Sequence, residues 1–255
     1  ALPSVLHAAL RFLDVVLGFP AAGYQEELAA RLKEMTESLD GVAKARVNVS
    51  FAIQAHAVQK GVKTISGIKN IIAIASGKGG VGKSTTATNL ALALAAEGAK
   101  VGILDADIYG PSQPRMMGIH GKPESKDGQT LEPMVSYDVQ CMSIGFLVDE
   151  ETPMIWRGPM VTQALQQLLD DTNWSELDYL VIDLPPGTGD VQLTLAQQVP
   201  VSGAVIVTTP QDIALLDARK GFKMFEKVEV PVLGIVENMS IHICSNCGHE
   251  EHIFA

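Results

Sequence analysis

The 255-residue sequence predicts an α/β fold in which helices flank a mostly parallel sheet, and two patterns support this prediction. Apolar runs without hydrophobic alternation recur from residue 70 onwards, at 71–76, 101–107, 179–186, 203–210 and 231–239. Strands buried on both faces have this composition. Segments with helical spacing, including 84–97 and 211–227, lie between several of these runs. The alternation is typical of right-handed βαβ units around a parallel sheet.

The pattern of apolar and polar residues divides the chain into three parts. Residues 1–57 are expected to form a small α/β domain, partial at its N-terminal end, because strand, helix and strand patterns follow one another there. Residues 58–69 are polar, contain Gly and Lys, and are predicted to be a linker. Residues 70–255 carry the apolar runs and are predicted to form the main domain.

Within the first part, residues 11–20 are expected to form a strand that ends at Pro20. Residues 24–39 have their apolar side chains on one helical face, so a helix is predicted there. Residues 45–51 alternate between apolar and polar side chains, which is the period-2 pattern of a half-buried strand.

Composition excludes several classes of protein. Hydrophobic residues make up 47% and aromatic residues 5% of the chain, and the formal net charge is −10. Binding to nucleic acid requires Lys and Arg to displace counterions from phosphates, so no nucleic-acid partner is expected. The apolar start of the chain is interrupted by Pro3, Arg11 and Asp14, which argues against a membrane segment or signal peptide. Three cysteines favour a reducing compartment, so a soluble cytoplasmic protein without a membrane partner is expected.

A phosphate-binding loop is predicted at "GKGGVGKST", residues 77–85, which follows a strand and opens a helix. The glycines let backbone N–H groups curl around a phosphate, and the helix N-terminus faces the same anion. Lys83 adds a full charge at the β- and γ-phosphates, and the Ser84 hydroxyl is placed to bind Mg²⁺. The expected nucleotide-binding residues of this loop are Gly77, Lys78, Gly79, Gly80, Val81, Gly82, Lys83, Ser84 and Thr85.

Carboxylates at strand ends support the nucleotide prediction. Asp183 ends a predicted strand, where a carboxylate commonly holds the Mg²⁺ hydration shell, and the glycine-rich turn 185–190 could sense a γ-phosphate. Asp105 and Asp107 end another predicted strand, and either one could orient the attacking water or bind a metal. Solvation of strand ends or helix capping is the alternative for all three. The guanine-reading pattern N/T-K-x-D is absent, which favours ATP over GTP.

Lys78, the second residue of the loop, makes the motif resemble the deviant Walker-A family, which includes MinD, the nitrogenase iron protein and the arsenite-pump ATPase. The resemblance implies a homodimer in which Lys78 reaches the partner's nucleotide. It also implies that Asp107 acts on water, and that Asn238 in "GIVENMS" reads adenine. The expected catalytic residues are therefore Lys78, Lys83, Asp107 and Asp183.

Seven motifs occur together in order: "SGKGGVGKST", "LDADIYGPS", "WRGPM", "DLPPGTGD", "TTPQDIALLDARKG", "GIVENMS" and "CSNCGH". This set closely resembles the Mrp/ApbC-type iron–sulfur cluster carriers, and "LGFPAAGYQEEL" resembles the small domain that precedes their ATPase. The resemblance implies a cluster carrier that hydrolyses ATP, with apoproteins and assembly scaffolds as partners. Members of that family usually continue well past the cysteine pair. We therefore expect either that the chain is a fragment with a truncated ATPase domain, or that its sheet lacks an edge element and the covering helices.

Cys244 and Cys247 supply two metal ligands, whereas a tetrahedral zinc or an iron–sulfur cluster normally needs four. Two copies related by a two-fold axis would supply four thiolates for a [4Fe–4S] cluster. A zinc site completed within one chain by His242, His249 or His252 is an alternative, as are a redox pair and incidental cysteines. Cys141 is expected to be a buried strand residue.

Two other functions fit parts of the sequence. A MinD/ParA-like positioning ATPase with a structural zinc site would need an amphipathic C-terminal helix or a basic face, and neither is visible in the sequence. An electron-transfer ATPase like the nitrogenase iron protein has cluster cysteines that lie far apart in sequence, unlike this adjacent pair.

Overall fold

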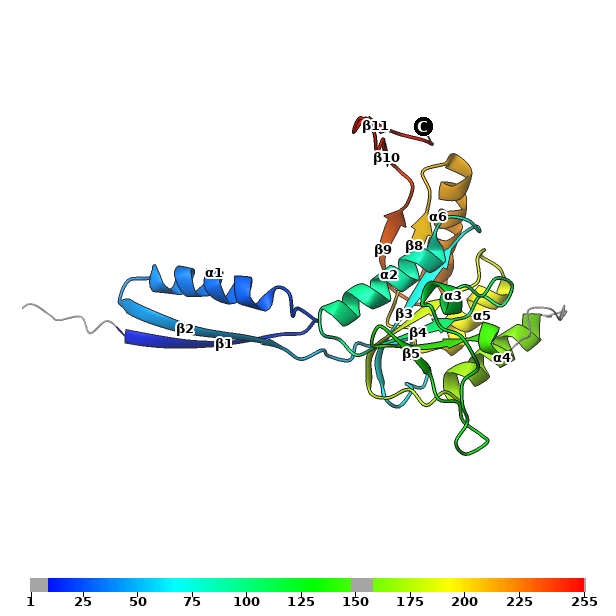
Figure 1. The fold of residues 1–255 in the computed structure, drawn as a ribbon, viewed down its shortest axis with the longest axis horizontal. Helices are drawn as coiled ribbons and strands as arrows, with labels where there is room; N and C mark the ends of the chain where they lie inside the picture. Colours follow the sequence, from blue (N-terminus) through cyan, green and yellow to red (C-terminus); the bar gives the residue numbers. More distant parts are fainter. Residues whose placement is uncertain (1–8, 148–157, 255) are drawn as a thin grey trace, which may run out of the picture. The chain divides into compact units, whose positions relative to one another are not determined.

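The structure is a computed structural model that describes residues 9–147 and 158–254 (Figure 1). The chain divides into two compact units. The first comprises Ala1–Gln54 with Ala96–Ala99, and the second comprises Ala55–Ala95 with Lys100–Ala255. Each unit is described separately below.

The first unit is a strand–helix–strand element, consisting of β1 (Ala9–Leu17), α1 (Gln25–Glu37) and β2 (Val42–Phe51). The two strands pair in parallel, which requires a crossover such as α1 between them. β1 ends three residues before the predicted boundary at Pro20, which has no backbone N–H to donate to a ladder. In β2, alternate side chains are more buried, so the predicted half-buried strand is confirmed.

The second unit contains a seven-stranded sheet with the order β5-β6-β4-β7-β3-β8-β9. Its strands are β3 (Ile68–Ser76), β4 (Val101–Asp105), β5 (Met134–Ser136), β6 (Val139–Ser143), β7 (Leu177–Asp183), β8 (Gly203–Thr208) and β9 (Val232–Glu237). All neighbours are parallel except β5 and β6, which confirms the mostly parallel sheet. β3 begins three residues earlier than predicted, inside the expected linker, because Ile68 pairs with Leu177 of β7.

Helices connect these strands (Figure 1). They are α2 (Lys83–Ala96), α3 (Gln113–Met116), α4 (Gly158–Asp170), α5 (Asp190–Gln198) and α6 (Asp212–Lys227), with a short 3₁₀ turn at Ile144–Phe146. The predicted helices 84–97 and 211–227 match α2 and α6 to within one residue, whereas α3, α4 and α5 were not predicted individually. α5 lies between α4 and α6 and contacts both, while α6 packs on β3, β8 and β9.

The strand register sets the position of the functional side chains. Asp105 at the end of β4 lies opposite Asp183 at the end of β7, and Asp183 lies opposite Ile74 of β3. The loop that follows β3 therefore begins beside both aspartates. The prediction that the aspartates lie at the same carboxyl edge of the sheet is confirmed.

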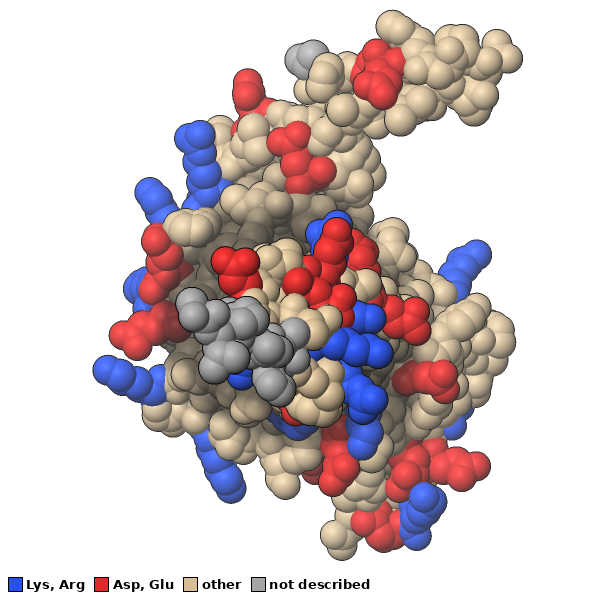
Figure 2. All heavy atoms as spheres, turned by 90° about the vertical axis from the view of Figure 1, so that its left-hand side faces the viewer, with Lys and Arg blue, Asp and Glu red and all other residues tan. Residues whose placement is uncertain are grey.

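Cys141 lies in β6 and is fully buried, as predicted, and burial raises the pKa of its thiol to about 12. None of the helices within residues 9–147 and 158–254 combines the length and apolar composition needed to cross a membrane. On the face shown in Figure 2, acidic and basic side chains are interspersed rather than separated into areas of one sign.

Candidate nucleotide site and cysteine hairpin

The predicted phosphate loop joins β3 to α2, and close packing explains why positions 77 and 82 are glycine. A Cβ on Gly77 would lie 2.5 Å from the backbone carbonyl carbon of Asp217. Gly82 has φ +89°, and a Cβ there would clash with the Asn238 amide. By contrast, Cβ atoms at Gly79 or Gly80 would meet no atom within 4 Å, so one side of the loop is open. The loop is thus fixed at its ends and accessible in the middle, as a phosphate cradle requires.

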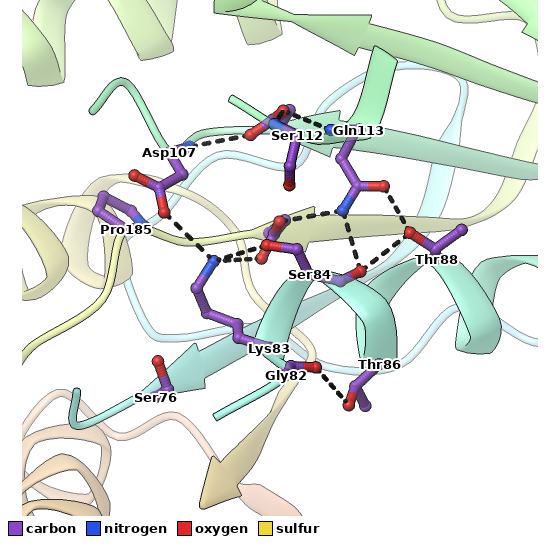
Figure 3. Close-up of polar contacts among 12 residues, drawn as sticks. Ser76, Gly82, Lys83, Ser84, Thr86, Thr88, Asp107, Ser112, Gln113 and Pro185 are labelled. Carbon is purple, nitrogen blue, oxygen red and sulfur yellow. Dashed lines mark hydrogen bonds and ion pairs between the residues drawn. The ribbon is translucent and has the colours of Figure 1, made fainter. Parts of the chain in front are cut away.

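Lys83 is buried among oxygen atoms at the start of α2 (Figure 3). Its Nζ lies 2.5 Å from Asp183 Oδ1 and 3.6 Å from Asp107 Oδ2. The same Nζ donates to Ser84 Oγ at 3.4 Å. The structure therefore brings together four residues that the sequence assigned to nucleotide binding, magnesium binding or catalysis.

The charges of this cluster do not balance, because two buried carboxylates face one ammonium group. Asp183 is fully buried, and Asp107 is 8% exposed. Burial raises the pKa of Asp107 above its ordinary value, Lys83 opposes this shift, and Asp183 adds to it. Asp107 Oδ1 is buried and has no hydrogen-bond partner. The excess of negative charge and the unpaired Asp107 Oδ1 favour the binding of a further cation or hydrogen-bond donor at this position.

Asp105, considered in the sequence as a catalytic or metal-binding residue, instead stabilises the loop that follows β4. Its Oδ2 accepts hydrogen bonds from the backbone N–H groups of Ser112 and Gln113, both at 2.9 Å, and from Ser143 Oγ at 3.2 Å. Its Oδ1 accepts from the Asp107 N–H at 3.2 Å. Burial, partly opposed by these bonds, raises the pKa of Asp105 to about 6. Both carboxylate oxygens of Asp105 therefore accept hydrogen bonds from the loop after β4. This structural role corresponds to the capping alternative raised from the sequence.

Two polar side chains of this loop, Ser112 and Gln113, were missed by the sequence analysis. Gln113 is fully buried, and its side-chain amide contacts Ser84, Thr88 and Asp183. Ser112 Oγ is buried without a hydrogen-bond partner. "GPSQPRMMG" contains no periodic pattern, so only the proximity of these residues to the aspartate motif could have drawn attention to them.

The remaining predicted residues lie around the loop. Lys78 Nζ donates to Gln211 Oε1 at 2.8 Å, at the start of α6 in its own chain. Asn238, which follows β9, donates from its side chain to Val81 O at 2.9 Å and from its backbone to Thr208 O at 2.8 Å. Thr85 is exposed on the first turn of α2. Adenine reading by Asn238 and the action of Lys78 across a dimer stay predictions. Trp156 and Arg157 of the quoted "WRGPM" motif lie outside the described residues.

The cysteine pair occupies a small hairpin after β9, between β10 (His242–Ile243) and β11 (Glu250–Glu251). The Cys244 N–H donates to His249 O at 2.9 Å, and the Gly248 N–H donates to Cys244 O at 2.8 Å. Hydrogen bonds from the backbone N–H groups of Cys247 and Asn246 lower the pKa of the Cys244 thiol. Neither thiol is in a disulfide, Cys247 is exposed, and Cys244 is half-buried. The hairpin thus favours a thiolate, the form that binds metals.

Histidines do not complete a metal site around this pair. Within the described part of the chain, no three His, Cys, Asp or Glu side chains lie together as a metal would require. His252 Nδ1 instead lies 3.1 Å from Ser240 O. In residues 9–147 and 158–254, the hairpin therefore presents two thiol ligands without the two histidine ligands that the zinc alternative needs.

Comparison with known proteins identifies the family. The family model of the NUBPL iron-transfer P-loop NTPases, in the ParA group, matches residues 67–255. An iron-sulfur cluster carrier protein of Pseudomonas fragi is 62% identical over 225 residues, which cover 88% of this chain and 78% of the relative. The carrier protein of Escherichia coli K12 is 69% identical over 191 residues, which cover 74% of this chain and 52% of the relative. The match thus spans about half the length of the Escherichia coli relative.

A mouse relative and two solved structures extend this picture. The iron-sulfur cluster transfer protein NUBPL of Mus musculus is 58% identical over 194 residues, covering 75% of this chain and 61% of the relative. A nucleotide-binding protein of Archaeoglobus fulgidus, solved in complex with ADP, is 44% identical with a TM-score of 0.65 and covers 74% of each chain. The chimerical protein CapA2B2 is 23% identical with a TM-score of 0.53, covering 66% of this chain and 75% of its own, and shows the fold alone. The chain belongs to the Mrp/ApbC/NUBPL family of iron–sulfur cluster carriers, which are MinD/ParA-like P-loop NTPases.

Proposed function

We propose that this protein binds and hydrolyses ATP and carries an iron–sulfur cluster, which two copies of the chain hold between them and transfer to apoproteins. The observation that carries the proposal is the pairing of a complete phosphate-loop site with a two-thiol hairpin in one chain. Family membership supports both halves. The chain matches 52% of the Escherichia coli relative, so the activity of a whole carrier protein is part of the proposal.

The nucleotide would lie along the phosphate loop, with the open side at Gly79 and Gly80 facing its phosphates. Magnesium fits the residues present, because Ser84 and Asp183 offer hard oxygen ligands and the neighbouring carboxylates leave a surplus of negative charge. A bound magnesium ion would neutralise the phosphate charge that develops during hydrolysis. Lys83 would then contact the β- and γ-phosphates.

Asp107 would position the attacking water. Its Oδ1 is buried and has no partner, so it can accept a hydrogen bond from water without losing an existing one. Burial also raises its pKa, which makes the carboxylate a better proton acceptor. Lys78 would act on the nucleotide of the second copy after exchanging its hydrogen bond with Gln211 for the phosphates. This role depends on a dimer.

The cluster, as cargo, would be held by Cys244 and Cys247 of each copy. Four thiolates match a [4Fe–4S] cluster, and a two-fold axis lets one chain supply half of a symmetric site. Within the described residues no third ligand joins the pair, which favours ligands from a second copy. ATP binding or hydrolysis would change the geometry between copies and switch the cluster between retention and release.

The proposal includes assembly scaffolds and iron–sulfur apoproteins as partners, and action in the cytoplasm. The free thiols of the three cysteines fit a reducing compartment. Mixed charge on the face seen in Figure 2 is consistent with protein partners and does not favour nucleic acid.

Anaerobic purification followed by metal analysis and optical spectroscopy tests the proposal. One four-iron cluster per dimer corresponds to about two iron atoms per chain, with broad visible absorption that bleaches on oxidation. A positioning ATPase with a structural zinc site predicts one colourless zinc ion per monomer, lost when His249 or His252 is changed. A full load of zinc without visible absorption in iron-replete protein would reject the carrier function.

A further inference from the structure

Gln113 is a buried amide that connects three parts of the nucleotide site (Figure 3). Its Nε2 donates to Asp183 Oδ2 at 3.0 Å and to Ser84 O at 3.1 Å. Its Oε1 accepts from Thr88 Oγ1 at 2.7 Å. Both amide hydrogens and the amide oxygen are therefore used, and the residue is fully buried. Water is not available to replace any of these bonds.

These contacts separate the roles of the two Asp183 oxygens. Oδ1 lies 2.5 Å from Lys83 Nζ, and Oδ2 accepts a hydrogen bond from Gln113 Nε2. A carboxylate fixed at both oxygens cannot rotate freely, so the direction of its lone pairs is set before a metal arrives. Residues that orient a metal-binding carboxylate in this way govern metal affinity without touching the metal.

The backbone of Gln113 is held as firmly as its side chain. Its N–H donates to Asp105 Oδ2 at 2.9 Å, as does the N–H of Ser112. Asp105 belongs to β4, next to the β7 strand that carries Asp183. The loop from Asp105 to Gln113, which also contains Asp107, is thus tied at one end to the sheet and at the other to Asp183.

We infer that Gln113 is a positioning residue that orients Asp183 for magnesium and holds the Asp107 loop against the phosphate loop. The inference rests on the proposed nucleotide function. It assigns a role to a residue outside the phosphate-loop motif and outside the acidic residues.

The test measures equilibrium binding of a fluorescent, non-hydrolysable ATP analogue as magnesium is titrated, using the full chain. In Gln113→Met, an apolar side chain of similar length cannot donate to Asp183. The magnesium concentration for half-maximal binding is expected to rise about 10–100-fold, while binding without magnesium stays near that of the unchanged protein. Gln59→Met is the matched control, because Gln59 is also buried and donates to Ala196 O and Val199 O, away from the site.

Gln113→Glu gives a second readout through pH. The new carboxyl group would face the acceptors Asp183 Oδ2 and Ser84 O, so it can donate only when protonated. The shift in magnesium midpoint is therefore expected to be large at pH 8 and to shrink as pH falls towards 6. Asp105, Asp107, Asp183 and Lys83 also surround this position, and each pH is compared with the unchanged protein to remove their titration.

The outcomes separate the inference from the proposed function. A lower melting temperature in both Gln113 variants with an unchanged magnesium midpoint would show a structural role and overturn the inference. If Gln113→Met does not fold by circular dichroism, the pH dependence of Gln113→Glu decides in the same way. If the unchanged protein itself shows no magnesium-dependent binding, and Lys83→Ala binds equally well, the proposed function fails instead.

Discussion

The carboxyl edge of the sheet and the cysteine hairpin differ in how much of a site one chain provides. At the sheet edge, Lys83, Asp183 and Gln113 are buried and joined by hydrogen bonds that connect two strands and two helices. In the hairpin, two two-residue strands support Cys244 and Cys247, and the side chains around them are exposed. Burial lets the first site be fixed before its ligand binds, whereas the second lacks half of its expected ligands.

This difference implies that the two sites respond to different variables. Nucleotide and magnesium binding should depend mainly on buried residues of one chain, whereas turnover should also depend on Lys78 of a second copy. The cysteine site should depend on association between copies. Within one chain, Asn238 lies between β9 and the hairpin and donates to Val81 O of the phosphate loop at 2.9 Å, so it is a contact through which the two sites could be coupled. The following variants test this separation.

Lys83→Ala is expected to reduce ATP turnover by at least on the order of 10²–10³, because the charge that faces the phosphates is lost. It also leaves Asp107 and Asp183 buried without their cation, so the free energy of unfolding should fall by about 3–5 kcal/mol. Steady-state hydrolysis and urea denaturation measure the two effects. Hydrolysis at the unchanged rate would show that the nucleotide site is assigned wrongly.

Cys244→Ala and Cys247→Ala should each lower the iron content from about two atoms per chain to near zero, since a dimer of either variant keeps only two of the four thiolates that a four-iron cluster needs. Binding of ATP should be unaffected. Cys141→Ala serves as the control, because that thiol is buried in β6. Iron retained by both hairpin variants would place the cluster elsewhere.

Asp107→Asn should lower turnover by about 10²–10⁴ while nucleotide affinity is kept, because orientation of water is lost but no phosphate contact is removed. The comparison requires kcat together with a direct measurement of ATP binding. Equal turnover in the variant and the unchanged protein would exclude Asp107 as the residue that positions water.

Lys78→Ala should reduce turnover about 10–100-fold, the value of one or two charge-assisted contacts in the transition state, and affect ATP binding less. Mixing this variant with Lys83→Ala tests action across the dimer. A mixed dimer would contain one active site with an intact loop lysine and an intact Lys78 from the other copy. Recovery of activity on mixing supports the role of Lys78 in the partner's site, and no recovery contradicts it.

Asp105→Asn should change the pH dependence of the free energy of unfolding. The folded-state pKa of about 6 lies above the ordinary 3.8, so the folded protein holds this proton more tightly than the unfolded chain. This contribution to stability is fully present below pH 3.8 and is lost as pH rises to about 6, at a cost of about 3 kcal/mol. Urea denaturation between pH 4 and 6 should show a shallower fall in the variant, and identical slopes would disprove the assignment.

The sequence by itself determined the phosphate loop and five strands of the main sheet, namely β3, β4, β7, β8 and β9, whereas β5 was not predicted. Apolar runs such as 71–76 and 179–186 can be satisfied only by burial on both faces, so local composition was enough to predict β3 and β7. The glycines around Lys83 follow from the shape of a phosphate and of a helix N-terminus, which are also local. The spacing of Cys244 and Cys247 was enough to predict a pair of metal ligands, although not the kind of metal site.

Only the tertiary structure decided which side chains meet. The strand order places β7 between β3 and β4, and this brings Asp183 to Lys83, 100 residues away in sequence. The order of strands in a sheet cannot be deduced from spacing in the sequence. The hydrogen bonds from Gln113 to Asp183 and from Lys78 to Gln211 were therefore not predictable. Asp105 and Asp107, two residues apart, received different roles because one faces backbone N–H groups and the other faces Lys83.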